Sequence, residues 1–218
     1  MPAAAECFYH DGKSLYDVSG NIFDSATISF RPGPGALDPS WSRVTGREAV
    51  AWVQGRRDHR IRPPIGVIGP REASDDERER AFLLGKELAS AGLTVLCGGR
   101  QGVMEEVCRG VDAEGGISIG LLPERDWKSG NQYVGVPLST GIGIARNALI
   151  ACSAHVVVAV GAGLGTISEM ALALQFEKRV FALADTCVVP GVETFSSWKA
   201  MEPHFYSAVL NWRAETLS

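Results

Sequence analysis

Hydrophobic and polar positions change their pattern near residue 62. Beyond it, short apolar runs alternate with stretches whose apolar residues recur at helical spacing, as Ile167, Met170 and Leu174 do. The run Val156–Val160 is β-branched throughout, as expected of a strand buried on both faces of a parallel sheet. The pattern predicts an α/β fold, a parallel sheet with helices on both faces. Its expected strands are 65–68, 93–97, 117–122, 134–138, 156–160 and 180–184, and its expected helices follow Ser74, Gly102, Gly143, Thr166 and Phe195.

The first 62 residues follow a different pattern. Aromatic and β-branched residues are interrupted at Asp11-Gly12 and Ser19-Gly20, which predicts short antiparallel strands joined by tight turns. A loop rich in proline and glycine is expected over 31–40, and a short helix over 45–54. The sequence therefore predicts two parts, a β-rich extension over 1–62 and the larger domain over 63–218.

Composition and charge narrow the classes of function. The chain has 218 residues, 45% hydrophobic content and a net charge of −4, so no general attraction to nucleic acid or to an anionic membrane is expected. The start of the chain lacks the pattern of a signal peptide, and no apolar run is long enough to span a membrane. The scattered cysteines predict neither a metal site nor a disulfide framework, so a cytoplasmic setting is expected. They are Cys7, Cys97, Cys108, Cys152 and Cys187.

Three loops, 69–74, 98–102 and 161–166, each lead from an expected strand into an expected helix. In open α/β sheets ligands bind along the edge where such loops lie. Glycines remove side chains, so backbone N–H groups can approach an anion, and a helix N-terminus adds about 0.3–1 kcal/mol. The alternative is that the glycines only allow close packing. The candidate phosphate-binding residues are Gly69, Arg71, Gly98, Gly99, Arg100, Gly102, Gly163, Leu164, Gly165 and Thr166.

The glycine spacing excludes two common nucleotide motifs. No G-K-[ST] follows either glycine loop, so neither is a P-loop. Gly161-x-Gly163-x-Gly165 is one residue tighter than a dinucleotide fingerprint, which argues against NAD. Asp185, after the next strand, could bind a sugar hydroxyl or could simply be an exposed loop residue. Thr166 is expected to cap the helix that follows the third loop.

Arg146 and Glu169 are the candidate catalytic pair. The strand at 156–160 connects their helices, so the two side chains are expected to be neighbours. An arginine binds phosphate or carboxylate through two hydrogen bonds, and a positioned carboxylate acts as a general base or stabilises a cationic sugar transition state. The alternative is a structural ion pair. Arg71 and Arg100 either add positive charge to the site or are merely solvated.

The segments CGGRQGVMEEVCRGV, GIARNALI and VGAGLGTISEM together resemble one family. It contains molybdenum cofactor carrier proteins, the Lonely Guy cytokinin-activating phosphoribohydrolases and proteins labelled "possible lysine decarboxylase". The resemblance extends over about 65–184. It implies a Rossmann-like sheet, a phosphate-binding edge, and a homodimer or homotetramer.

The resemblance also implies roles for individual residues. Lonely Guy enzymes cleave the N-glycosidic bond of nucleoside 5′-monophosphates with an arginine and with the glutamate of P-G-G-x-G-T-x-x-E. Here 161–169 occupies that motif and Arg146 stands at the matching place. Gly161-Ala162 and Ser168 depart from it, and Arg100 and Glu105 replace glycines of the hydrolases. In these features the sequence is more similar to the carrier proteins of the family than to its hydrolases.

Two functions are therefore predicted. The first is a cytoplasmic protein that binds a phosphorylated small ligand, a nucleotide or a molybdopterin-type cofactor, and needs no cofactor of its own. The second is a nucleoside 5′-monophosphate phosphoribohydrolase. An interaction protein with a vestigial site is a third class. Lysine decarboxylation is not expected, because every lysine in 63–218 lies on a polar stretch unsuited to pyridoxal phosphate: Lys86, Lys128, Lys178 and Lys199.

Overall fold

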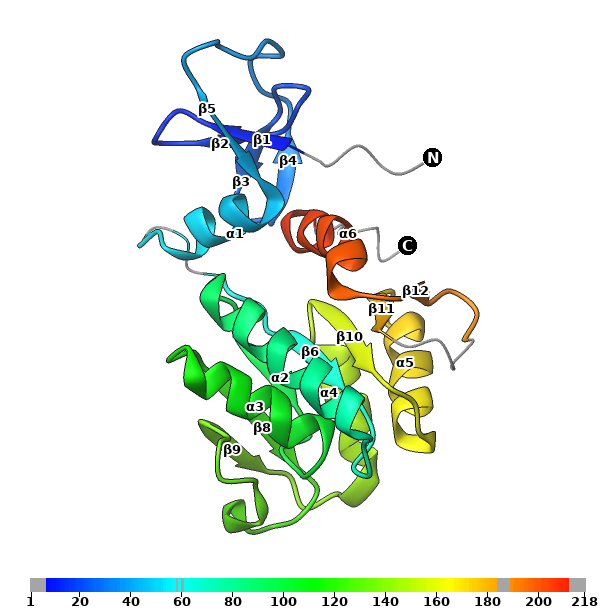
Figure 1. The fold of residues 1–218 in the computed structure, drawn as a ribbon. Helices are drawn as coiled ribbons and strands as arrows, with labels where there is room; N and C mark the ends of the chain where they lie inside the picture. Colours follow the sequence, from blue (N-terminus) through cyan, green and yellow to red (C-terminus); the bar gives the residue numbers. More distant parts are fainter. Residues whose placement is uncertain (1–6, 58, 60, 184–188, 212–218) are drawn as a thin grey trace. The chain divides into compact units, whose positions relative to one another are not determined.

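The computed structural model describes residues 7–57, 59, 61–183 and 189–211 (Figure 1). Contacts divide the described residues into two compact units, a larger unit of 63–200 and an N-terminal unit of 7–62 with 201–211. The sequence predicts a domain of 63–218, whereas the contacts group 201–211 with the N-terminal residues. The reason is apolar packing in that unit, where Tyr206 lies against Gly46 and Phe205 is fully buried.

The larger unit is built on a seven-stranded sheet in which every pairing is parallel. Its order is β12-β11-β10-β6-β7-β8-β9. Strands β7 to β9 are therefore added on one side of β6 and strands β10 to β12 on the other, which makes the boundary between β6 and β10 the point where the strand order reverses. This confirms the predicted parallel sheet and adds β12, a short polar strand that the sequence does not predict. The strands are β6 (Ile65–Ile68), β7 (Val95–Cys97), β8 (Ser118–Leu122), β9 (Val136–Ser139), β10 (Val156–Val160), β11 (Arg179–Leu183) and β12 (Glu193–Phe195).

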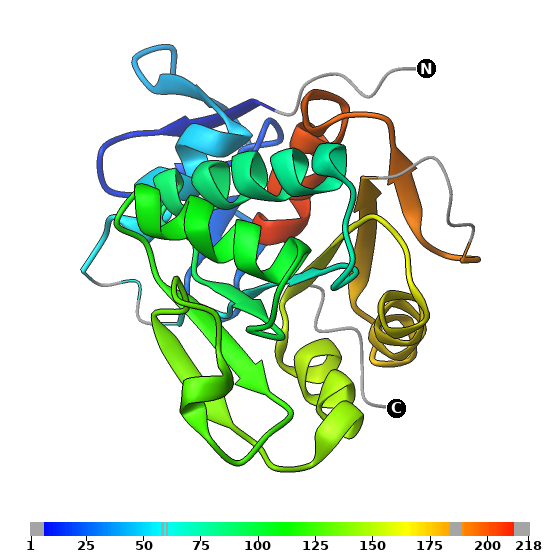
Figure 2. The same cartoon turned by 60° about the horizontal axis from the view of Figure 1, so that its bottom comes forward.

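Helices cover both faces of this sheet, as the sequence predicts. Figure 2 shows α2 (Asp75–Ser90) and α3 (Val103–Ala113) on one face, and α4 (Arg146–Ser153) and α5 (Leu164–Gln175) on the other. Ile150 and Met170 of the second pair are fully buried against strand residues such as Val157. Two short 3-10 turns, η1 (Trp127–Ser129) and η2 (Gly143–Ala145), lie in the connections around β9.

The N-terminal unit contains a five-stranded antiparallel sheet in the order β4-β3-β2-β1-β5. The predicted turns at Asp11-Gly12 and Ser19-Gly20 join its first strands. Thr45 caps the short helix through a reciprocal capping box with Glu48. The elements are β1 (Cys7–His10), β2 (Leu15–Tyr16), β3 (Ile22–Asp24), β4 (Ser29–Arg31), β5 (Ser42–Thr45), α1 (Gly46–Gln54) and α6 (Trp198–Leu210), which starts in the larger unit.

No helix of the described residues is both long and apolar enough to cross a membrane. They also contain no group of three or more His, Cys, Asp or Glu side chains that could hold a metal ion.

Candidate functional site

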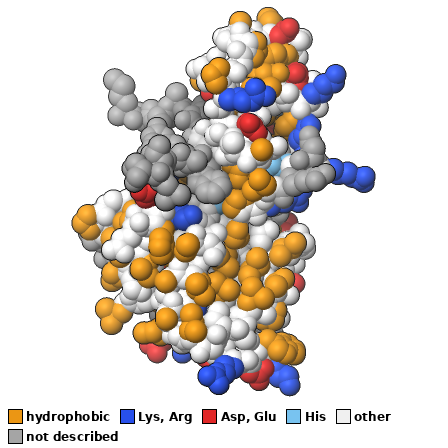
Figure 3. Space-filling view, turned by 180° about the vertical axis from the view of Figure 1, so that it is seen from behind, with side chains coloured by type: hydrophobic (Ala, Val, Ile, Leu, Met, Phe, Trp, Pro, Cys, Tyr) orange, Lys and Arg blue, Asp and Glu red, His pale blue; other side chains and the backbone are white. Residues whose placement is uncertain are grey.

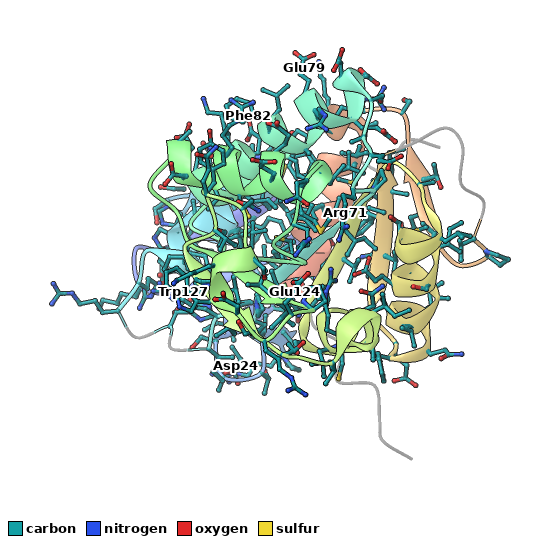
Figure 4. The ribbon with its side chains drawn as sticks, turned by 90° about the horizontal axis from the view of Figure 1, so that it is seen from below. Asp24, Arg71, Glu79, Phe82, Glu124 and Trp127 are labelled. Carbon is teal, nitrogen blue, oxygen red and sulfur yellow. The ribbon has the colours of Figure 1, made fainter. Side chains whose placement is uncertain are left out.

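The carboxyl ends of the parallel strands lie along one edge of the larger sheet. β6 and β10 are neighbours there, and the reversal between them is where ligands bind in open α/β sheets. Figure 4 looks onto this edge and labels Arg71, from the loop after β6, and Glu124, from the loop after β8. All three predicted loops, 69–74, 98–102 and 161–166, begin at this edge.

The glycines of the 98–102 loop are required by packing. A Cβ on Gly98 would overlap the guanidinium group of Arg146, which lies directly against this backbone. A Cβ on Gly99 would lie only 2.7 Å from a methyl group of Leu122. Gly102 has a φ of +71°, and a Cβ there would collide with the backbone of the loop after β6. These glycines therefore position the loop and Arg146, whatever else they do.

The start of α3 is already occupied by protein groups. The backbone N–H of Val103 donates a hydrogen bond to the Pro70 carbonyl oxygen at 3.2 Å. Two acids, Glu105 and Glu106, lie in the first turn of the helix, where they compete with any bound anion. Gly69 also has a packing role, since a Cβ there would lie 2.5 Å from a methyl group of Val103.

The third loop leads into α5 differently from the prediction. Helix α5 begins at Leu164 with the extended residue Gly163 as its N-cap, so Thr166 lies inside the helix and does not cap it. The reason is that the first intrahelical bond runs from the Ile167 N–H to the Gly163 carbonyl, at 2.8 Å. Among the described residues, no side chain caps this N-terminus. Its first-turn N–H groups are the available donors.

Space remains in front of these donors. A Cβ on Gly163 would come no closer than 3.6 Å to another residue, Pro70, and one on Gly165 no closer than 3.8 Å, to Asn147. The side chain between them, Leu164, is 89% exposed. Packing within the larger unit therefore does not require glycine at 163 or 165, unlike the glycines of the 98–102 loop.

Three buried polar atoms at this edge lack a hydrogen-bond partner among the described residues. They are the Thr166 hydroxyl oxygen, in a residue that is 2% exposed, and the Nε atoms of Arg146 and Arg100. A buried polar group without a partner costs about 1–3 kcal/mol, so such groups call for an explanation. A bound polar ligand that forms hydrogen bonds with these atoms is one such explanation.

Arg146 and Glu169 meet as a buried pair. Arg146 is the first residue of α4, and Glu169 lies in the second turn of α5, which packs beside it. The Nη1 of Arg146 donates to Oε1 of Glu169 at 3.0 Å. The two residues are only 8% and 6% exposed.

Burial dominates the electrostatics of the pair. It raises the pKa of Glu169 to about 7, although the charge of Arg146 and its hydrogen bond oppose the change. Burial also lowers the pKa of Arg146, against the opposing charge of Glu169. Removal from water therefore outweighs mutual attraction for both partners, as is common for buried ion pairs. A carboxyl group with a pKa near 7 can exchange protons at neutral pH.

The two remaining predicted arginines differ in their surroundings. Arg71 is exposed at the sheet edge. Arg100 forms an ion pair with Glu124 through its Nη1, which also donates to the carbonyl oxygen of Ser129 at 3.4 Å. Although burial raises the pKa of Glu124, hydrogen bonds from Ser129 and the charge of Arg100 hold it lower than usual. The charge of Arg100 is therefore already neutralised by the 123–131 connection.

Two neighbours of the third loop are not predicted from the sequence. Asn147 follows Arg146 and lies next to Gly165; its Nδ2 donates to the Ser168 hydroxyl at 3.4 Å. The carboxylate of Glu77 packs against Gly161, where it also completes the capping box of α2. The capping pattern identifies the role of Glu77 in α2, but nothing local indicates its contact with a loop more than 80 residues away. Asp185, the suggested sugar partner, lies outside the described residues.

Comparison with known proteins agrees with this fold. Residues 62–205 match the model of the SLOG cluster4 family. An uncharacterized protein of Archaeoglobus fulgidus is 35% identical over 133 residues, which are 61% of this chain and 87% of that protein.

Two solved structures extend the agreement. The molybdenum cofactor binding protein from the phototrophic bacterium Rippkaea orientalis is 34% identical, with a TM-score of 0.63 over 68% of this chain and 98% of that one. The Moco carrier protein from Chlamydomonas reinhardtii is also 34% identical, with a TM-score of 0.62 over the same shares. The similarity covers nearly all of both proteins and leaves about a third of this chain unmatched.

Proposed function

Because the chain belongs to the SLOG cluster4 family, we propose that it binds a phosphorylated small ligand at the carboxyl edge of its parallel sheet. The ligand is a nucleotide or a molybdopterin-type cofactor, held as cargo. The phosphate lies at the N-terminus of α5, where it accepts hydrogen bonds from the backbone N–H groups of Leu164, Gly165 and Thr166.

One observation carries this proposal. The first turn of α5 has N–H groups that no described side chain caps, and the glycines around it leave the approach open. The positive end of a helix with free donors is suited to phosphate. The unpartnered Thr166 hydroxyl adds a further hydrogen-bonding group to the same turn. Arg71, exposed at the same edge, adds positive charge.

The class of ligand rests on the relatives. Two solved proteins that share about a third of their residues with this chain bind or carry the molybdenum cofactor. The departures from the hydrolase motif at Gly161-Ala162 and Ser168 also favour a carrier. A carrier needs a site that holds its ligand and no bond-breaking step, so the edge as described is sufficient.

A change at Leu164 tests the binding site directly. Leu164 is the first residue of α5, a position where proline is well tolerated, and Gly163 before it has an extended backbone that proline accepts. Leu164→Pro therefore removes one N–H donor with little effect on the fold. Leu164→Ala removes the side chain and keeps the donor, so it is the matched control.

Binding of nucleoside 5′-monophosphates and of molybdopterin would be measured by titration calorimetry. A hydrogen bond to a charged group contributes about 1.5–3 kcal/mol. Leu164→Pro should therefore lower the affinity for the tightest-binding ligand at least about ten-fold. Leu164→Ala should bind nearly as well as the unmodified protein. Equal affinities of the two variants, or affinities that do not change when inorganic phosphate competes, would overturn the proposal.

The buried pair favours a second function, the hydrolysis of nucleoside 5′-monophosphates. Glu169 would stabilise the positive charge that develops on the sugar or orient the attacking water, and Arg146 would hold Glu169 in place. Released base and ribose 5-phosphate would be assayed for the unmodified protein and for Glu169→Gln. Release that disappears in Glu169→Gln while the ligand still binds would establish the enzyme. Ligand binding without any release would leave the carrier.

We further propose that the protein is a homodimer or homotetramer and acts in the cytoplasm. Exposed apolar side chains just before η2 and on η2, α4 and α5 support an interface between copies: Ile142, Ile144, Leu149, Leu164 and Ile167. Figure 3 shows hydrophobic side chains across one face of the larger unit. Ile144→Asp should lower the molar mass measured by light scattering, whereas Leu83→Asp, on a helix of the other sheet face, should not. The free thiols of Cys97 and Cys108 suit a reducing compartment.

A further inference from the structure

The N-terminal unit has a cavity of its own, of about 270 Å³. All of the described residues that line it fall within 13–59, which lies outside the family match at 62–205. The cavity therefore does not belong to the sheet edge of the larger unit. Its volume is near the lower end for small-molecule sites and suits a ligand with one or two rings.

The lining of this cavity is positively charged. Among the described lining residues, Lys13, Arg31 and Arg56 contribute three cations and Asp24 one anion, a formal balance of +2 in a chain whose net charge is −4. Arg31 is only loosely paired, with its Nε 3.8 Å from the Asp24 carboxylate and 63% of its side chain exposed. Low-dielectric walls concentrate the field of such charges within a cavity. An anion is therefore the expected occupant.

Aromatic and aliphatic side chains form the rest of the wall. The guanidinium group of Arg56 lies 4.6 Å from the centre of the Trp52 ring, which holds this planar cation in a defined position. A fixed guanidinium can stack on a flat ring or bind a carboxylate or phosphate through two hydrogen bonds. Phe23 and Ile22 add apolar surface to the same cavity. This combination is complementary to a ring that carries a negative charge.

We propose that the cavity of the N-terminal unit is a second binding site, which takes a small planar anion with one or two aromatic rings. Arg56 and Arg31 bind the anionic group, and the rings lie against Phe23 and Ile22. The anionic group is a carboxylate or a phosphate, and both are tested below. This site is independent of the phosphate site proposed at the start of α5.

The test uses 1-naphthoate and 1-naphthyl phosphate as probes and neutral 1-naphthol as the control ligand. Binding to the full chain is measured by calorimetry in a Gly163→Val background, which blocks the approach to the α5 site. We expect both anions, or whichever carries the preferred group, to bind at least ten-fold more tightly than naphthol. The tighter of the two identifies carboxylate or phosphate as the natural group.

Substitutions then locate the bound probe. Arg56→Gln and Arg31→Gln should each weaken the anion at least five-fold, and the exposed position of Arg31 ensures a folded variant. Arg57→Gln makes the same change of charge at an exposed neighbour outside the lining, so it should leave the affinity unchanged. No binding of either anion, equal binding of naphthol, or equal losses in Arg56→Gln and Arg57→Gln would overturn the proposal.

Discussion

The two glycine-rich loops of the larger unit have nearly the same sequence character but different surroundings. In the loop after β7, each of Gly98, Gly99 and Gly102 lies so close to other groups that a Cβ would overlap or crowd them. In the loop after β10, Gly163 and Gly165 have no such neighbour. The protein fills the space around all three glycines of the first loop. In the second loop it fills the space around Gly161, where Glu77 packs, and leaves it open around Gly163 and Gly165.

This difference separates two roles that a glycine motif cannot distinguish. The first loop supports Arg146 and joins the β6 and β7 connections, so its glycines serve the fold. The second presents free backbone donors at the start of α5, so Gly163 and Gly165 suit a ligand. The glycines of the first loop should matter for stability, and Gly163 and Gly165 should matter for affinity.

The largest effect is expected from Gly102→Ala. Its φ of +71° disfavours any side chain, and the new Cβ would collide with the backbone of the loop after β6. We expect the free energy of unfolding to fall by about 4 kcal/mol, measured by urea denaturation. Gly163→Ala is the matched change in the loop after β10. It should lower the free energy of unfolding by less than about 1 kcal/mol and should lower the affinity for the phosphorylated ligand. Similar losses of stability in both variants would remove the contrast between the loops.

A smaller effect is expected from pH, through the pair that connects the two loops. Burial raises the pKa of Glu169 from 4.5 to about 7, so the folded state binds a proton more tightly than the unfolded state. Its contribution to stability is fully present below pH 4.5 and is lost as the pH rises through about 7. Relative to Glu169→Gln, the unmodified protein should lose about 3 kcal/mol between these values and then change little. A difference that stays constant from pH 4 to 8 would show that Glu169 is ionised throughout.

The smallest effect is expected at Arg100. Because Glu124 already pairs with it, Arg100→Met should leave ligand affinity within about two-fold and lower stability by at most about 1 kcal/mol. The comparison is Arg71→Met, which removes the exposed cation of the same edge. It should lower the affinity for the ligand without changing the stability of the protein. A larger loss of affinity in Arg100→Met than in Arg71→Met would mean that Arg100 leaves Glu124 to bind the ligand.

The sequence predicts the parallel sheet well because buried strands and amphipathic helices have distinct periods. Ile65–Ile68 and Val156–Val160 match the structure residue for residue. The short strand Glu193–Phe195 has no apolar run, so no period reveals it. The start of α5 is misplaced because threonine is a better capping residue than glycine, whereas here the extended backbone of Gly163 decides where the helix begins.

Parts of the candidate site are beyond sequence reasoning for a different reason. The approach of Arg146 to Glu169 follows from chain order, since one strand joins their helices. The pairing of Arg100 with Glu124 and the contact of Glu77 with Gly161 depend on how separate loops fold over the sheet edge. The openness around Gly163 is a property of its neighbours in space, and no local pattern records it.

The division of the chain into units makes the larger unit an insertion within the smaller one. The chain leaves the N-terminal unit after residue 62 and returns to it at residue 201. There α6 supplies the buried Phe205 and Tyr206. Closing a gap of 138 residues has an entropic cost that an already folded insert reduces by fixing the ends of the gap. Folding of the Rossmann-like unit therefore assists its host. A protein shortened at residue 200 would lose part of the core of its N-terminal unit while keeping the whole parallel sheet.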